Sequence, residues 1–295
     1  MHVVLAGSSG FLGSHLAQAL GQAGHEVTPL VRRPARRSES SWDPYAGHID
    51  LDLIGSADVV INLAGSPTAG NPHSRNWARE LQHSRVTTTR VLAEAIATSS
   101  NPPAFLVGNG ISYYGDHGAQ VLDEETPSTG TALLTRVTRA WQEAAQPASA
   151  IGARVVILRT APVMDQSNPP LKLLLPLFRA GLGARLGTGN QYFPVISLRD
   201  WVTAVIHLAD NPVTGPVNLC CEHTPTNAEF TRALAARVRR PAFLRVPGSA
   251  IRVGAGAMAP ELLGSVNARP AALLSAGYQF LDPDVGAVLD TALSD

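Results

Sequence analysis

The segment GSSGFLG, residues 7–13, constrains the fold of this chain more than any other sequence feature. An apolar run at residues 2–6 precedes it, and a helical pattern at residues 11–24 and a second apolar run at residues 26–31 follow it. In a strand–turn–helix setting, glycines allow a tight turn, bring the backbone close to a pyrophosphate and pack the helix on the strand. Free N–H groups at the helix start then hold the negative charge. We predict a dinucleotide site formed by Gly7, Ser9, Gly10, Phe11, Leu12 and Gly13. The alternative is a glycine turn without a ligand.

Further short apolar runs alternate with helical patterns along the chain. The runs are at residues 58–63, 104–107, 154–158 and 216–221, and the helical patterns are at residues 79–98, 132–145 and 201–209. Strands of nearly continuous Val, Ile and Leu separated by helices are typical of a parallel sheet covered on both faces. The sequence therefore predicts an α/β fold, a Rossmann-type doubly wound parallel sheet.

The remaining segments are less regular. Residues 162–194 are rich in Pro, Gly and Leu, and from residue 222 onward Pro and Gly interrupt several helical patterns. We expect these segments to form a small, mainly helical C-terminal lobe. The predicted division is residues 1–165 plus about 195–221 for the Rossmann domain, and residues 166–194 plus 222–295 for a small substrate lobe.

The end of the second predicted strand indicates which dinucleotide is bound. NAD enzymes usually place Asp or Glu there to bind the ribose 2′-hydroxyl. This chain has Val31-Arg32-Arg33-Pro34 instead, and a guanidinium pairs well with a 2′-phosphate. The sequence favours NADP(H), with Arg32 as the first candidate and Arg33 as the second. Two solvated surface arginines are the alternative, because this loop is rich in Arg.

The run at residues 58–63 leads into Asn62-Leu63-Ala64-Gly65. Small residues at the carboxyl edge of such a sheet let the backbone approach the adenine-ribose part of a dinucleotide. We therefore include Asn62, Leu63, Ala64 and Gly65 among the predicted cofactor contacts. A plain strand-to-loop turn remains the alternative reading of these four residues.

Charge and composition limit the classes of partner. The chain has 295 residues with 23 Lys plus Arg and 23 Asp plus Glu, so its formal net charge is zero. Nucleic acids and anionic membranes require a basic excess, so neither is an expected partner. The longest apolar stretches, such as residues 171–178, are too short to span a bilayer.

Cys220 and Cys221 are the two cysteines, and they are adjacent. Neighbours in a strand point to opposite faces, so this pair is not expected to form an ordinary disulfide. Two cysteines alone do not make a zinc site, and no metal site is expected. The N-terminal ten residues lack the basic and long apolar regions of a signal peptide. We expect a reducing, cytoplasmic location.

Several motifs occur together in an order that is similar to one known family. They include Trp42-Asp43-Pro44, Ser84-Arg85-Val86, Tyr113-Tyr114-Gly115-Asp116, Arg159-Thr160, the segment at residues 176–193 and Gly215-Pro216-Val217-Asn218. With the glycine turn, they resemble the atypical branch of extended short-chain dehydrogenases/reductases, the NAD-dependent epimerase/dehydratase-like "epimerase family proteins". The resemblance covers essentially the whole chain. It implies a Rossmann domain that binds NADP(H) and a small C-terminal lobe.

The resemblance also implies particular cofactor contacts. They come from the glycine turn, from Arg32, and from Asn62 and Leu63. The helix of the long crossover contributes Arg79, where the family has Lys, and Ser84. The loop Thr160-Ala161-Pro162 is expected to face the nicotinamide, which adds Ala161 and Pro162.

The usual catalytic pair of this superfamily, Tyr-x-x-x-Lys on a helix, is absent from the sequence. Its lysine lowers the pKa of the tyrosine, which then works as a general acid or base. The sole lysine of this chain, Lys172, follows Asn168 at that spacing, and the expected positions of the pair hold Leu134 and Thr138. The branch that this chain resembles also tends to lack the pair.

The candidate catalytic residues follow the predicted strand at residues 104–107. Asn109 stands where related sequences often have serine, and its amide can polarise a carbonyl. Ser112, Tyr113 and Tyr114 remain as donors near the nicotinamide. For the two tyrosines, the alternative is packing with one hydrogen bond to the backbone. Two departures from the family, Asn190 and Ser197, make the expected substrate wall less basic.

Two functions are compatible with this pattern. The first is an NADP(H)-dependent oxidoreductase or epimerase acting on a small carbonyl or hydroxyl compound, with the cofactor carrying the hydride. The alternative is a non-catalytic NADP(H)-binding sensor or scaffold protein, which the absent Tyr-x-x-x-Lys pair favours. The sequence does not identify the substrate. It is compatible with a homodimer.

Overall fold

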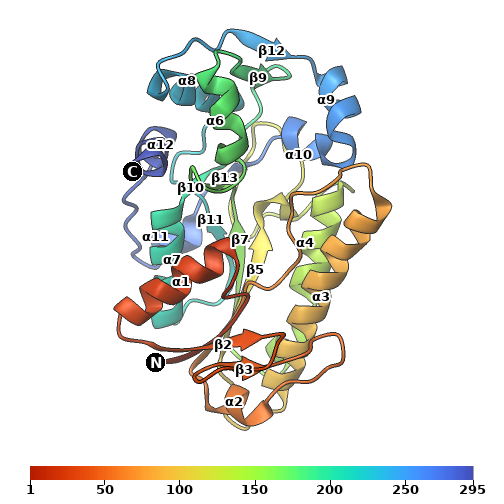
Figure 1. Ribbon diagram of the computed structural model, residues 1–295, viewed down its shortest axis with the longest axis vertical. Helices are drawn as coiled ribbons and strands as arrows, with labels where there is room; N and C mark the ends of the chain where they lie inside the picture. Colours follow the sequence, from red (N-terminus) through yellow and green to blue (C-terminus); the bar gives the residue numbers. More distant parts are fainter. Residues whose placement is uncertain (295) are drawn as a thin grey trace.

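A seven-stranded parallel sheet forms the centre of the computed structural model, which describes residues 1–294 (Figure 1). Its order is β11-β7-β5-β4-β1-β2-β3. The strands are β1 (His2–Ala6), β2 (Glu26–Val31), β3 (Ser40–Ser41), β4 (Val59–Asn62), β5 (Ala104–Gly110), β7 (Val155–Thr160) and β11 (Gly215–Leu219). Every neighbouring pair in this sheet is parallel, so the predicted doubly wound sheet is confirmed.

Alternate residues of β1 enter two different cores. Val3 and Leu5 pack with α1 (Phe11–Gln22) and α7 (Leu198–Asp210) on one face of the sheet. Val4 and Ala6 pack with α3 (Arg75–Ala97) and α5 (Gln146–Ala150) on the other. Both faces are therefore covered, which explains why the strands are apolar throughout rather than alternating with polar residues.

The small lobe lies beyond the carboxyl ends of the central strands (Figure 1). It contains α6 (Leu171–Arg179), α8 (Asn227–Arg237), α9 (Gly248–Ala255), α10 (Ala259–Leu263) and α12 (Val285–Leu293). Strand β9 (Ala184–Leu186) pairs in parallel with β12 (Leu244–Val246), which joins the two chain segments assigned to this lobe. Phe178, Phe230 and Leu289 lie in its own apolar core.

One part of the C-terminal segment departs from the predicted division. Leu273, on α11 (Ala271–Ser275), and Tyr278 belong to the same core as the sheet. The Tyr278 hydroxyl donates to Oδ1 of Asp200 on α7, at 2.9 Å. Because this segment buries its apolar side chains against the sheet, residue 222 is not a clean boundary between the two bodies.

Several elements differ in length from the expected ones. The helix expected at residues 79–98 begins four residues earlier, where the Ser74 side chain accepts the Trp77 N–H as an N-cap. Strand β5 continues to Gly110, and α4 (Leu133–Glu143) ends two residues short of its predicted end. The remaining short elements are α2 (Leu51–Ser56), η1 (Ile111–Tyr113), β6 (Val121–Leu122), β8 (Val163–Met164), β10 (Ile196–Ser197), η2 (Gly256–Met258) and β13 (Asn267–Ala268).

The two adjacent cysteines follow β11 and are both buried and free. Cys220 belongs to the core of the sheet, whereas Cys221 belongs to the core of the small lobe. Among residues 1–294, no helix combines the length and the apolar character that crossing a membrane requires.

Candidate functional site

The glycines of the turn between β1 and α1 serve two different purposes. Gly7 has a φ of +84°, and a Cβ there would lie 2.6 Å from the carbonyl carbon of Leu63. A Cβ at Gly13 would lie 2.1 Å from the Gly7 oxygen. At Gly10, by contrast, the nearest atom would be 3.3 Å away, and the residue is exposed. Gly7 and Gly13 therefore permit internal packing, whereas Gly10 leaves its outer side open to a ligand.

The N-terminus of α1 suits an anion. Gly10 is its N-cap and supplies no side chain to accept the first N–H groups. The first turn contains no acidic residue. Unpaired N–H groups and the positive end of the helix dipole both favour a negative charge at this point. The residues present thus fit the pyrophosphate of a dinucleotide.

The two arginines after β2 have different environments. Arg33 donates from Nη1 and Nη2 to the two carboxylate oxygens of Glu39, both at 2.7 Å. These bonds, with the Arg36 N–H, lower the pKa of Glu39 to about 2. Arg32 is exposed and makes no hydrogen bond or ion pair within the described residues. Arg32 is therefore the one of the two whose guanidinium is available for a 2′-phosphate.

Polar side chains at the end of β4 and on the facing part of α3 hydrogen-bond to the loop that follows β4, and they do not face outward. Asn62 is fully buried, donates to Oγ1 of Thr89 at 2.9 Å and accepts the Ala64 N–H at 3.0 Å. The buried Ser84 hydroxyl accepts the Ser66 N–H at 3.0 Å. Any contact of this loop with a cofactor is left to the backbone and to Leu63, Ala64 and Gly65.

The other residues implied by the resemblance lie in varied settings. Arg79 is exposed and donates to Oδ1 of Asn76 on its own helix. Ala161 is buried, and its N–H donates to the Leu219 oxygen at 2.9 Å. Thr160 and Pro162, which are partly exposed, are the parts of that loop open to a ligand.

Asn109 is buried at the end of β5, and both ends of its amide are occupied. Its Nδ2 donates to the Thr138 carbonyl oxygen at 3.0 Å, and its Oδ1 accepts the Gly110 N–H at 2.7 Å. These bonds tie β5 to α4. Asn109 is also buried and lines neither of the two cavities described below, so its position does not support the predicted polarisation of a substrate carbonyl.

Tyr114 lines neither of the two cavities described below, so its prediction as a proton donor needs correction. The side chain is fully buried, and its hydroxyl lies 2.8 Å from both the Asp123 carbonyl oxygen and Oδ1 of Asn218. Arg159 donates to the same hydroxyl at 2.9 Å. Burial raises the pKa of Tyr114 to about 12. The residue is a structural link between the sheet and the loop after β5.

Tyr113 and Ser112 are neighbours but line different cavities. The Tyr113 ring stacks on the guanidinium carbon of Arg159, 3.7 Å from the ring centroid. It lines a cavity of about 560 Å³ with Glu143 and Pro216. Ser112 lines a separate and larger cavity. The 3₁₀ turn after β5 therefore separates the two candidate hydroxyls.

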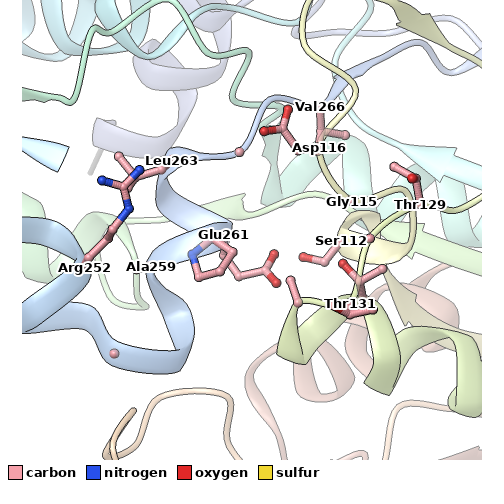
Figure 2. Close-up of a pocket in the computed structure, with 16 residues that line it drawn as sticks. Ser112, Gly115, Asp116, Thr129, Thr131, Arg252, Ala259, Glu261, Leu263 and Val266 are labelled. Carbon is pink, nitrogen blue, oxygen red and sulfur yellow. The ribbon is translucent and has the colours of Figure 1, made fainter. Parts of the chain in front are cut away.

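The larger cavity, of about 640 Å³, lies between the end of β5, the start of α4 and the small lobe (Figure 2). The Rossmann side contributes hydroxyl groups from Ser112, Thr129, Thr131 and Thr135, together with Asp116. The lobe side contributes Arg252, Glu261, Leu263 and Val266.

Glu261 is the residue of this cavity that the sequence analysis missed. It is partly buried on α10, close to Ser112 and to the N–H of Leu134. Desolvation raises the pKa of its carboxyl, and these two neighbours partly counter the rise. No spacing rule connects a short C-terminal helix to the end of β5, so the sequence held no signal for this contact.

Comparisons with known proteins identify the family of the chain. The model of the NAD dependent epimerase/dehydratase family matches residues 3–220, and that of a domain of unknown function, DUF1731, matches residues 246–292. An epimerase family protein of Mycobacterium bovis is 40% identical over 293 residues, covering 98% of this chain and 97% of the relative. The human epimerase family protein SDR39U1 is 33% identical and covers 98% of each chain.

Comparisons with solved structures also find epimerase proteins. A crystal structure of human SDR39U1 with NADPH has a TM-score of 0.87 and 30% identity and covers 99% of both chains. A nucleoside-diphosphate sugar epimerase from Corynebacterium glutamicum has a TM-score of 0.80 and 32% identity, and the match covers 99% of this chain and 58% of that one. The chain belongs to the NAD-dependent epimerase/dehydratase family, and its relatives include the SDR39U1 epimerase family proteins.

Proposed function

We propose that this chain is an NADP(H)-dependent oxidoreductase or epimerase-like enzyme acting on a small carbonyl or hydroxyl compound. The observation that carries the proposal is the cavity at the end of β5, which places the Ser112 hydroxyl and the Glu261 carboxyl together. Ligands of open α/β sheets bind outside the carboxyl ends of the strands. Within the family, NADP(H) would supply or accept the hydride.

The chain's own residues have separable roles in this proposal. The exposed start of α1 around Ser9 and Gly10 would hold the pyrophosphate, and Arg32 would bind the 2′-phosphate. The Ser112 hydroxyl would donate a hydrogen bond to a substrate oxygen and orient it. The cavity walls contain two acids, Asp116 and Glu261, and one base, Arg252. This balance favours an uncharged substrate over one carrying a diphosphate.

The choice of NADP(H) over NAD(H) is the first part to test. The human relative crystallised with NADPH, and Arg32 makes no competing ion pair here. A charge-assisted contact is worth about 1.5–3 kcal/mol, so we expect NADPH to bind at least about tenfold more tightly than NADH. Calorimetric titration with both cofactors measures the ratio. The change Arg32→Ala should abolish it without altering stability.

Another exposed arginine of the same loop, Arg37, provides a control. Arg37→Ala changes the local charge equally, and it should retain most of the preference for NADPH. Equal affinities of the wild type for both cofactors, or an undiminished preference in Arg32→Ala, would refute the assignment. The proposed homodimer and cytoplasmic location stay predictions.

A non-catalytic NADP(H)-binding protein is the second candidate. It is favoured by Leu134 and Thr138 at the usual positions of the tyrosine and lysine, and by the occupied amide of Asn109. Steady-state assays with benzaldehyde and phenanthrenequinone, and with the corresponding alcohols, distinguish the two candidates. Tight NADPH binding without turnover in either direction supports the binding protein.

A further inference from the structure

The substrate cavity contains a carboxyl group with one buried oxygen, unpaired among the described residues, on Glu261. Glu261 makes no ion pair within residues 1–294. Its Oε1 is buried and has no hydrogen-bond partner there. Buried polar atoms in folded proteins are nearly always hydrogen-bonded, so an unpaired one calls for an explanation. An oxygen atom of a bound substrate would supply the absent partner.

Ser112 and α4 fix where this carboxyl acts. Figure 2 shows the Glu261 carboxyl and the Ser112 hydroxyl directed toward each other across the cavity. The N–H of Leu134, in the first turn of α4, also lies against the carboxyl. Leu134 stands where the standard superfamily pattern places its catalytic tyrosine. The small lobe therefore brings an ionisable group to the part of the site from which that tyrosine is absent.

We propose that Glu261 is the catalytic acid and base of the site, exchanging a proton with the substrate oxygen that Ser112 orients. This inference rests on the proposed function and names the proton donor that the function requires. The other candidates are placed unfavourably, because Tyr114 is buried, Tyr113 lines a different cavity and the Asn109 amide is occupied.

The proton and electron balance of the step is simple. In carbonyl reduction, the carbonyl carbon accepts a hydride from the reduced nicotinamide, which is oxidised. The C=O π bond breaks, and the carbonyl oxygen takes the proton of the Glu261 carboxyl to form the hydroxyl. The resulting carboxylate is reprotonated by water. Alcohol oxidation runs the same transfers in reverse, with the Glu261 carboxylate as the base.

The surroundings of Glu261 favour the protonated form of its carboxyl relative to that of an exposed glutamate. Burial raises the pKa of Glu261, with the Ser112 hydroxyl and Leu134 N–H acting in the opposite direction. Asp116 also lines the cavity, where Oδ1 accepts the N–H groups of Gly118 and Ser265. The Arg252 guanidinium is directed toward Leu263, away from the Glu261 carboxyl (Figure 2).

The substitution Glu261→Gln tests the inference because it keeps the shape of the side chain and removes the proton. We expect NADPH affinity to remain unchanged while reduction of benzaldehyde or phenanthrenequinone falls by about 10²–10⁴-fold. The change of rate with pH that titration of Glu261 causes in the wild type should be absent from the variant. Glu125→Gln, at an exposed glutamate, is the matched control and should keep the wild-type rate and profile.

An infrared titration of the protein without cofactor gives a second readout. A protonated-carboxyl band should persist after the exposed glutamates, with pKa values near about 4.3, have ionised. Burial also raises the pKa of Glu124, so the Glu261 contribution is the part of the band that is lost in Glu261→Gln and kept in Glu124→Gln and Glu125→Gln. Ser112→Ala should shift its titration to higher pH, because the hydroxyl favours the charged carboxylate.

The outcomes separate this inference from the proposed function. Failure of the wild type to bind NADPH, or absence of turnover despite tight binding, counts against the proposed enzyme. The infrared titration still decides whether Glu261 holds its proton. Full turnover by Glu261→Gln with an unchanged pH profile overturns the inference while leaving the enzyme assignment intact. A Glu261 carboxyl that titrates together with the exposed ones also overturns it.

Discussion

Gly10 and Gly13 lie in the same turn, yet the structure predicts opposite consequences for their substitution. A Cβ at Gly13 would lie 2.1 Å from the Gly7 oxygen and 2.8 Å from the Gly7 carbonyl carbon. Both atoms belong to the backbone, so relief requires α1 to move away from β1. Overpacking costs about 1–3 kcal/mol, and contact with two backbone atoms places this case at the upper end, about 2–3 kcal/mol. The gain of up to about 1 kcal/mol from placing Ala in a helix then leaves a net loss of about 1–2 kcal/mol.

Gly10 can accept a side chain after a small local shift of the Gly7 oxygen, and its backbone is suitable. Its φ of −77° and ψ of 169° are in the extended region, which valine adopts readily, and the nearest atom to an added Cβ is 3.3 Å away. Replacing Gly at an N-cap by an apolar residue costs only a modest amount of helix stability. The branched side chain would nevertheless occupy the exposed path proposed for the pyrophosphate.

We therefore expect Gly13→Ala to lower the free energy of unfolding by about 1–2 kcal/mol. Gly10→Val should lower it by about 1 kcal/mol or less, the cost of an apolar residue at the N-cap, and abolish NADPH binding. Urea unfolding followed by circular dichroism and calorimetric titration with NADPH measure the two effects. The reasoning is refuted if Gly13→Ala is as stable as the wild type. Normal NADPH binding by a folded Gly10→Val protein would show that the phosphates lie elsewhere.

Two further substitutions test the structural roles of buried polar groups. Tyr114→Phe removes the hydroxyl that accepts from Arg159 and lies against Asn218, so the free energy of unfolding in urea should fall by about 1–3 kcal/mol. NADPH affinity should not change, and a loss of affinity would contradict the structural role. Burial raises the pKa of Glu124, so the folded state binds its proton more tightly than the unfolded state does. Stability of the wild type should decline as pH rises from the ordinary Glu pKa of about 4.3 through the raised one. In Glu124→Gln, the urea midpoint should decline less over this pH range, because the titrating carboxyl is gone. Parallel declines in the two proteins would contradict the contribution of Glu124.

The parts of the fold that follow from local pattern were predictable. The glycine turn, the apolar strands and the periodic helices each occupy a short stretch of chain, and β1 and β2 have the bounds expected of them. Phosphate binding by Arg32 in preference to Arg33 stays a prediction, and the structure adds a reason for it that the sequence did not indicate. The ion pair of Arg33 with Glu39 depends on how the loop closes onto β3.

The arrangement of the candidate site was not predictable because it depends on side-chain direction and on contacts between distant parts of the chain. Ser112 and Tyr113 diverge because a 3₁₀ turn follows β5, and no sequence rule placed that turn. The sequence did not indicate that the Asn109 amide donates to the Thr138 carbonyl oxygen of α4, because the two residues are far apart in the chain. Glu261 reaches the cavity only because the small lobe lies over the carboxyl ends of the strands.

The position of the two cysteines has a consequence for measuring how this molecule opens. Cys220 and Cys221 are adjacent in the chain, but they are enclosed by different cores and both have raised pKa values. A buried thiol reacts with an alkylating reagent only after its surroundings open and its thiolate forms. Each cysteine therefore reports local opening of a different body, one of the sheet and the other of the small lobe. Comparing the two labelling rates in single-cysteine variants would show whether the bodies unfold together or in succession.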